Sequence, residues 1–457
     1  MRTRKESDSI GTLDVPEDVY YGVQTLRGFE NFQITGVKVN DSFIKNVVRI
    51  KKVAATVNGR YGYLEQSIAT AIVQACEEAL AGKFQADFIT DAVQGGAGTT
   101  VNMNVNEVLA NRATELLGGK KGEYLCHPND HVNHSQSTND VIPTAGKLTV
   151  LELADKLLHN LENLISALEN KAKEFDGIIK MGRTQLEDAV PIRLGQEFNA
   201  YASALKRDCR RLKEDLKEMN VVNLGGTAIG TCLNVGQEYL DHIAAELSKE
   251  CKREVVKADD LIDSTQNVDG FVSVSGSLKA CAVNLSKMCN DLRLMSSGPK
   301  TGLGEINLPA KQNGSSIMPG KVNPVIPEVV SQVAFLVIGN DMTIAMAAEG
   351  GQLELNAFEP VIFYKLFESL TCLSNAIRTL TENCIVGITA NRERCEALVY
   401  DSVGIVTALC PYLGYKKSAE LAKEALAKNM PIKELVLAYG LMDEQTLSGV
   451  LDPYAMT

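Results

Sequence analysis

The sequence lacks clusters of cationic residues. Its 46 lysines and arginines are outnumbered by 57 aspartates and glutamates, which gives a formal net charge of −11 at pH 7. Nucleic acids and anionic membranes are bound through clustered positive charge, so we exclude both as partners. A small molecule is the default substrate. If that molecule is an anion, the site has to supply positive potential locally, from lysine, arginine or helix N-termini.

The sequence also lacks the cysteine patterns of a metal site or a disulfide framework. Its eleven cysteines form no CxxC pair and no Cys/His cluster with metal-ligand spacing, and an odd number cannot pair completely within one chain. Free thiols in a reducing compartment fit best. Residues 1–7 carry charge with no apolar stretch after them, so no secretory signal is expected. We therefore predict a cytoplasmic protein without a metal site.

No long uninterrupted apolar run occurs. The longest one, Val329–Ala348, contains Ser331, Gln332, Asn340 and Asp341, which favours a buried helix over a membrane span. Strand signals are few, and the chain shows neither an internal repeat nor a low-complexity stretch.

Several long segments of this 457-residue chain show the spacing of apolar residues that is typical of amphipathic helices. Apolar residues recur every three or four positions over 148–172 and 198–219, and apolar density returns over 274–294 and 360–384. The segment Val329–Ala348 is apolar nearly all round, so protein should cover its whole circumference. One chain rarely buries a helix that completely. We therefore expect copies of the chain to pack together.

These patterns predict an all-α fold in three domains. A mostly helical N-terminal domain covers residues 1–140, and a central bundle of long helices covers 141–395. A small C-terminal helical domain covers 396–457.

Hydroxyl and amide side chains gather in four segments, each of which we expect directly before a helix. The segments are Gly98–Asn102, Ser135–Asp140, Gly182–Asp188 and Gly314–Pro324. A single segment of this kind is ordinarily a helix cap. Four segments with several polar residues each exceed what capping needs, and helix N-termini favour anions. Two or more such helix N-termini that point to one place would hold a dicarboxylate.

The fourth segment adds a cation, Lys321, and glycines on both sides of a serine pair. Glycine allows the backbone to move or to approach a ligand closely, so we interpret Gly314–Pro324 as a mobile loop. The simpler interpretation is a surface turn with a solvated lysine.

This fourth segment resembles the signature of the aspartase/fumarase superfamily, in which a glycine, two serines and a methionine precede Lys-x-Asn-Pro. The other segments match as well, and further matches extend the resemblance over essentially the whole chain. The further matches are residues 19–25, 95–99, 223–228 and 402–407. The resemblance implies the three-domain superfamily fold and a homotetramer that completes the central bundle and builds each site from three subunits.

Within the superfamily, the details favour the aspartases over the class II fumarases. Thr138 stands where fumarases usually have a second serine, and Lys321–Glu328 has the aspartase continuation. Gln185 stands where fumarases and some aspartases have histidine, although other aspartases use glutamine. His127–Asp130 instead favours the fumarases, since it resembles a second, non-catalytic carboxylate site of fumarases. A structural turn is the simpler interpretation of that segment.

The resemblance implies reversible deamination of L-aspartate to fumarate and ammonium through an aci-carboxylate intermediate, with Ser315 as the general base. The implied substrate-binding residues are Thr99, Ser137, Thr138 and Ser316 at the β-carboxylate, Thr184, Lys321 and Asn323 at the α-carboxylate, Asn139 and Gln185 at the amino group, and Met318 in the loop. No organic cofactor is required, and activation by a divalent cation stays open. The alternatives are a class II fumarase, which adds water, and a structural or binding relative without catalysis.

Overall fold

The computed structural model describes residues 2–457, which divide into two compact units. Within the described residues, unit 1 comprises 2–157, Arg211–Ala280 and Leu336–Cys372, and unit 2 comprises Leu158–Arg210, Cys281–Phe335 and Leu373–Thr457. The boundaries between the units fall inside long helices. The three domains that we expect from the sequence, with boundaries at residues 140 and 395, therefore stay a prediction.

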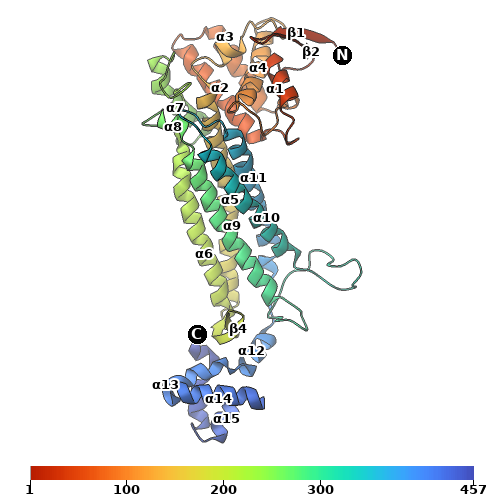
Figure 1. The fold of residues 1–457 in the computed structure, drawn as a ribbon, viewed down its shortest axis with the longest axis vertical. Coiled ribbons are helices and arrows are strands. Elements are labelled where there is room, and N and C mark those ends of the chain that lie inside the picture. The colour runs from red at the N-terminus through yellow and green to blue at the C-terminus, as the bar shows by residue number, and fades with distance from the viewer. Residues whose placement is uncertain (1) are drawn as a thin grey trace. The chain divides into compact units, whose positions relative to one another are not determined.

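Long helices dominate the chain (Figure 1). The longest are α5 (Thr138–Glu174), α6 (Leu194–Asp215), α9 (Asp269–Met295), α10 (Val325–Glu349) and α11 (Glu359–Asn383). Each coincides with a segment whose apolar periodicity predicts a helix, so the all-α class is confirmed. The few strands pair only in two-stranded sheets: β1 (Thr3–Ser7) with β2 (Thr12–Pro16), β3 (Ile179–Thr184) with β4 (Glu187–Arg193), β5 (Val221–Val222) with β6 (Val256–Lys257), and β7 (Ile306–Asn307) with β8 (Thr389–Ala390).

Over residues 2–457, unit 1 contains six shorter helices, and a buried carboxylate fixes the start of the first one. These helices are α1 (Val23–Asn31), α2 (Asp41–Arg60), α3 (Gln66–Leu80), α4 (Thr99–Leu116), α7 (Gln237–Cys251) and α8 (Asp263–Gln266). Glu107 on α4 accepts the backbone N–H groups of Gly22, Gln24 and Thr25 at 2.8–3.0 Å. It thereby satisfies donors that a helix start leaves free. A Cβ on Gly22 would lie 2.5 Å from Glu6 Oε2, so only glycine fits there.

Unit 2 includes the C-terminal helices, which pack around the hairpin of β3 and β4. These helices are α12 (Arg392–Asp401), α13 (Cys410–Leu413), α14 (Tyr415–Lys428), α15 (Ile432–Ala438) and α16 (Glu444–Val450). Ile179 and Met181 of β3 belong to the same buried cluster as Val399 and Leu421. The Ser402 hydroxyl donates to Asp188 at 2.7 Å. The C-terminal helices thus hold the hairpin by both apolar and polar contacts.

Helix α10 carries both buried polar residues and an exposed apolar face. Among residues 2–457 it is the one helix long and apolar enough to cross a membrane, by length and composition alone. However, Asn340 Nδ2 donates to Ser369 Oγ at 3.1 Å, and Asp341 accepts from Ser275 at 2.8 Å. Such pairs are typical of a helix packed within a protein. Its other face exposes Phe335, Met342 and Met346 by 64–67%, so one chain leaves this face uncovered.

Candidate active site

Three of the predicted substrate-binding residues lie at the start of α5 in unit 1. Thr138 is the first residue of the helix and Ser137 precedes it, so α5 begins inside the segment Ser135–Asp140 that we expect before the helix. The Ser137 hydroxyl oxygen accepts the backbone N–H of Asn139 at 3.2 Å. The Asn139 side chain donates to the Ala228 carbonyl at 2.7 Å. The amide that we expect at the substrate amino group is therefore already oriented by the protein.

Asp140 joins the start of α5 to the segment 223–228. One carboxylate oxygen accepts the N–H of Ser137 at 2.9 Å, and the other accepts those of Gly225 and Thr227 at 3.0 and 3.2 Å. Burial raises the pKa of Asp140 to about 6, while these backbone donors act in the opposite direction. This contact explains why residues 223–228 accompany Ser135–Asp140 in the superfamily pattern.

Thr99 is the first residue of α4, so most of the segment Gly98–Asn102 lies in the first turn of this helix and not before it. Gly98 caps this helix with a φ of 86°, a conformation that favours glycine. A Cβ on Gly98 would lie 2.9 Å from the Ile142 side chain, so α4 and α5 start close together. The Thr99 hydroxyl donates to the Gly96 carbonyl at 2.7 Å. The first and second polar segments thus meet within unit 1, as two converging helix starts.

A buried polar network, which the sequence did not predict, lies behind these helix starts. Lys51 is fully buried on α2, and its ammonium donates to Asn133 Oδ1 at 2.8 Å. Asn102 and Asn106 on α4 donate to the same oxygen at 3.2 and 3.1 Å. Asn102 Nδ2 also lies 3.2 Å from Thr138 Oγ1. Burial lowers the pKa of Lys51 to about 7. The recurrence of asparagine along α4 was the available sequence signal.

The third polar segment is not a helix start, and this prediction was wrong. Residues Gly182–Asp188 form the tip of the β3–β4 hairpin, and α6 begins only at Leu194. Gln185 and Leu186 have φ of 56° and 66°, which suits a two-residue hairpin turn. Pro191 lies in β4 opposite Met181, and a two-stranded ribbon has open edges where proline is tolerated. The tip carries Thr184 and Gln185 to the surface.

Four buried or half-buried charges stabilise the base of this hairpin. Glu305 is fully buried and accepts from Arg183 at 2.7 Å, and it pairs with Lys180 at 3.1 Å. Lys180 also pairs with Glu197 at 2.8 Å. Arg183, which lies in the third polar segment, therefore fixes the hairpin, and the neighbouring Thr184 is free to contact a ligand.

The fourth segment is a compact exposed loop directly before α10. The Ser315 hydroxyl oxygen accepts the backbone N–H groups of Ile317 and Met318 at 3.2 and 2.9 Å. Asn323 Nδ2 donates to the Gly314 carbonyl at 2.6 Å, and Gly314 N donates to the Lys321 carbonyl at 2.9 Å. The loop thus closes on itself and keeps the serine pair, Met318, Lys321 and Asn323 on one short segment.

The predicted site residues form two groups within the chain. Unit 1 holds Thr99, Ser137, Thr138 and Asn139, whereas unit 2 holds Thr184, Gln185, Ser315, Ser316, Met318, Lys321 and Asn323. The first group supplies neutral hydroxyl and amide donors, and the second group contains the serine pair and the cation.

The hydrogen bonds of His127–Asp130 are those of a structural turn. The His127 ring nitrogen accepts the N–H groups of Asn129 and Asp130 at 3.3 and 3.2 Å and caps the short helix Pro128–Val132. This side chain is therefore engaged in capping.

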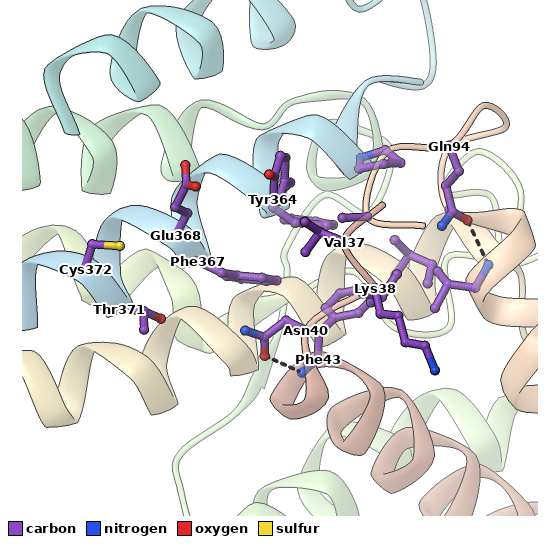
Figure 2. A pocket seen from close by; sticks show the side chains of 17 residues that line it. Val37, Lys38, Asn40, Phe43, Gln94, Tyr364, Phe367, Glu368, Thr371 and Cys372 are labelled. Atoms are coloured by element: carbon purple, nitrogen blue, oxygen red, sulfur yellow. Dashed lines mark hydrogen bonds between the residues drawn. The ribbon is translucent and has the colours of Figure 1, made fainter. Parts of the chain in front are cut away.

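A cavity of about 320 Å³ lies in unit 1 and is mainly apolar (Figure 2). Phe43 and Phe367 line it, and Lys38 is the one cation in its lining. None of the predicted site residues contributes to the lining. A cavity of this composition does not suit a dicarboxylate, which requires several polar donors.

All eleven cysteines are free thiols, as the sequence predicts. Among the described residues, no three His, Cys, Asp or Glu side chains form a group that could hold a metal ion.

Comparison with known proteins identifies the family. Residues 11–339 match the family described as Lyase, and residues 405–457 match the Fumarase C C-terminus family. The chain is 50% identical to the aspartate ammonia-lyase of Bacillus subtilis over 99% of this chain and 96% of that protein.

Two solved structures share the fold over nearly their full length. The fumarate lyase:delta crystallin of Brucella melitensis bound to cobalt superposes with a TM-score of 0.96 at 49% identity, covering 99% of both chains. The class II fumarase of Schistosoma mansoni superposes with a TM-score of 0.96 at 35% identity, covering 99% of this chain and 98% of that one. The chain therefore belongs to the lyase family of the aspartase/fumarase superfamily.

Proposed function

We propose that the protein is an aspartate ammonia-lyase, which converts L-aspartate reversibly into fumarate and ammonium. The observation that carries this proposal is the 50% identity to an aspartase along 99% of the chain. The class II fumarase with the same fold is only 35% identical. Thr138 and the residues 321–328 support the same choice between the two activities.

The chemistry requires several groups that act together. Removal of the proton from the β-carbon of aspartate creates a second negative charge on the β-carboxylate. A positioned base contributes roughly 10²–10⁴ in rate, or about 3–5 kcal/mol, whereas enzymes generally lower barriers by about 8–23 kcal/mol. Each preorganised donor aimed at the developing charge adds about 3–4 kcal/mol. We therefore propose that Thr99, Ser137, Thr138 and Ser316 surround this carboxylate.

Ser315 is the proposed general base, and the geometry of its loop supports this role. An alcohol is a weak base unless its alkoxide is stabilised, and each unit by which its pKa falls corresponds to about 1.4 kcal/mol. The two N–H groups of Ile317 and Met318 both point at Oγ, and donors of this kind favour a negative oxygen. Lys321 on the same loop adds a positive charge. In the proposed site Thr184, Lys321 and Asn323 hold the α-carboxylate.

We propose that the enzyme is a homotetramer in which three subunits build each site. The predicted site residues fall into two groups, one in each compact unit. The exposed apolar face of α10 supports association between copies, because apolar patches of this kind mark interfaces.

The proposed reaction uses acid–base and electrostatic catalysis, so we expect it to require no organic cofactor; activation by a divalent cation stays open. A cytoplasmic enzyme is also proposed, since free thiols persist in reducing compartments.

A product assay tests the proposed function. Purified protein is incubated with fumarate, either with ammonium or in water alone, and the products are identified by chromatography. Aspartate formed only with ammonium is the expected result. Malate in both incubations would instead establish a fumarase, and no product in either would support a relative without catalysis.

A further inference from the structure

We propose that Asn102 is a positioning residue for this reaction, one that turns the Thr138 hydroxyl into a dedicated donor and links it, through Asn133, to the buried Lys51. The inference rests on the proposed function, because it concerns the hydroxyl expected at the β-carboxylate. Asn102 itself need not touch the substrate.

The orientation of the Thr138 hydroxyl follows from its hydrogen bond to Asn102. Asn102 Nδ2 donates to Thr138 Oγ1 at 3.2 Å. A threonine hydroxyl has one hydrogen, and when its oxygen accepts from an amide, that hydrogen is available for another acceptor. Within residues 2–457 the Thr138 hydroxyl donates to no other group. Its O–H is therefore left for an acceptor that comes from outside, such as a substrate carboxylate.

The orientation of the Asn102 amide is fixed in turn by Asn133. Asn133 Nδ2 donates to the Gln136 carbonyl at 3.1 Å, so its oxygen faces Lys51 and Asn102. If the side-chain amide of Asn102 were rotated by half a turn, Asn102 Oδ1 would face Asn133 Oδ1, and the hydrogen bond between them would be lost. Lys51 and Asn102 therefore donate to one shared acceptor, Asn133 Oδ1. The same Asn102 nitrogen uses its second hydrogen to donate to the Thr138 oxygen.

This network carries a cost that packing alone does not explain. Lys51 is a fully buried lysine whose charged form is disfavoured by burial, and Asn102 Oδ1 is buried with no hydrogen-bond partner among the described residues. An unsatisfied buried polar group costs about 1–3 kcal/mol. Costs of this kind are expected where function requires the arrangement.

The charge of Lys51 gives the network its advantage during the reaction. Asp140 also contributes to the electrostatics around Lys51, but the two form no ion pair among the described contacts, and Asp140 instead accepts from three backbone N–H groups. Lys51 and Asn102 share one acceptor, so the ammonium acts on a bound anion through space, where the low-dielectric interior strengthens the attraction. A Thr138 hydroxyl connected to this ammonium by three hydrogen bonds should therefore bind the dianionic aci-carboxylate better than the substrate carboxylate, which is the requirement for a faster reaction.

A double-mutant cycle tests the inference. N102A, T138V and the double variant are compared by kcat/KM for L-aspartate, with N104A as the matched control. Asn104 is a buried asparagine on the same helix that donates to the Asp87 carbonyl at 2.9 Å, and it has no hydrogen bond to Thr138 among the described residues. We expect N102A to lower kcat/KM by about 10- to 100-fold, N104A to lower it less than threefold, and the double variant to resemble T138V, because neighbours that act through one another are not additive.

Ligand binding provides a second measurement that does not depend on the fraction of folded protein. 2-Amino-3-nitropropanoate carries a nitro group in place of the β-carboxylate, and its nitronate resembles the aci-carboxylate. We expect N102A to weaken binding of the nitronate at least tenfold more than binding of succinate.

Equal weakening of both ligands, or losses that multiply in the double variant, would overturn the inference and leave the proposed function intact. A parent protein without lyase activity would overturn both.

Discussion

Glu305 accepts a hydrogen bond from Arg183 at 2.7 Å and pairs with Lys180 at 3.1 Å, although no part of its side chain reaches solvent. Replacing Glu305 by glutamine removes the negative charge with which Arg183 and Lys180 are both paired. Breaking a buried ion pair in this way costs about 3–5 kcal/mol. We expect E305Q to lower the free energy of unfolding in urea by this amount. E187Q, which changes an exposed carboxylate on the same hairpin, should have little effect, and equal stability of the two variants would contradict the prediction.

Replacement of Ser315 by alanine should remove the general base. We expect kcat for deamination to fall by about 10²–10⁴, followed through the ultraviolet absorbance of fumarate, while the circular dichroism spectrum stays that of the parent. A rate within tenfold of the parent, which corresponds to about 1.4 kcal/mol, would rule out this role.

Lys321 provides the positive charge of the loop that carries the base. A hydrogen bond from a charged group contributes about 1.5–3 kcal/mol, so K321M should lower kcat/KM for L-aspartate by about 10- to 150-fold. K311M removes an exposed lysine shortly before the loop and serves as the control. Similar kinetics for both variants would mean that Lys321 does not contact the substrate.

The exposed face of α10 should tolerate apolar replacements and reject charge. M342E places a carboxylate on the proposed subunit interface, whereas M342L keeps the face apolar. We expect M342E to yield smaller species in light scattering and to lose activity, and M342L to behave as the parent. An M342E variant that is active as a single chain would refute the shared site.

Glu359 introduces a pH dependence of stability. The residue is fully buried, one of its oxygens has no partner among the described residues, and burial raises the pKa of Glu359 from 4.5 to about 8. The folded chain therefore holds this proton more tightly than the unfolded chain, and stability falls as the pH rises from about 4.5 to about 8.

The variant E359Q resembles the protonated side chain and should remove this dependence. In urea titrations its stability should match that of the parent near pH 5 and exceed it by a few kcal/mol at pH 8, since one pKa unit corresponds to about 1.4 kcal/mol. A constant difference between pH 5 and pH 8 would show that Glu359 does not titrate as proposed.

Most of the long helices were predictable because each buries one apolar stripe, and the period of that stripe is visible in the sequence, whereas α10 was predictable from its apolar residues on nearly all sides. A helix start near Asp140 and a loop before α10 were also predictable, since polar residues and proline stand together there, although α5 begins slightly earlier, at Thr138. The β3–β4 hairpin was not predictable from the sequence. Its polar tip has the composition of a helix cap, and Pro191 in an edge strand resembles a proline in the first helical turn.

The contacts of the buried polar network could not be predicted from the sequence, for a different reason. Lys51, Asn102 and Asn133 lie on three segments that only the tertiary fold brings together. Polar residues of these types are usually solvent-exposed, so neither their identity nor their spacing indicates burial. Glu305 was missed for the same reason.

The buried free cysteines allow the unfolding of each unit to be followed separately. Burial raises the pKa of Cys126 in unit 1, and of Cys384 and Cys395 in unit 2, to about 12, so these thiols hardly ionise at neutral pH. The thiolate is the form that alkylating reagents attack. Pulsed alkylation followed by mass spectrometry would therefore register when either unit opens, without an introduced probe.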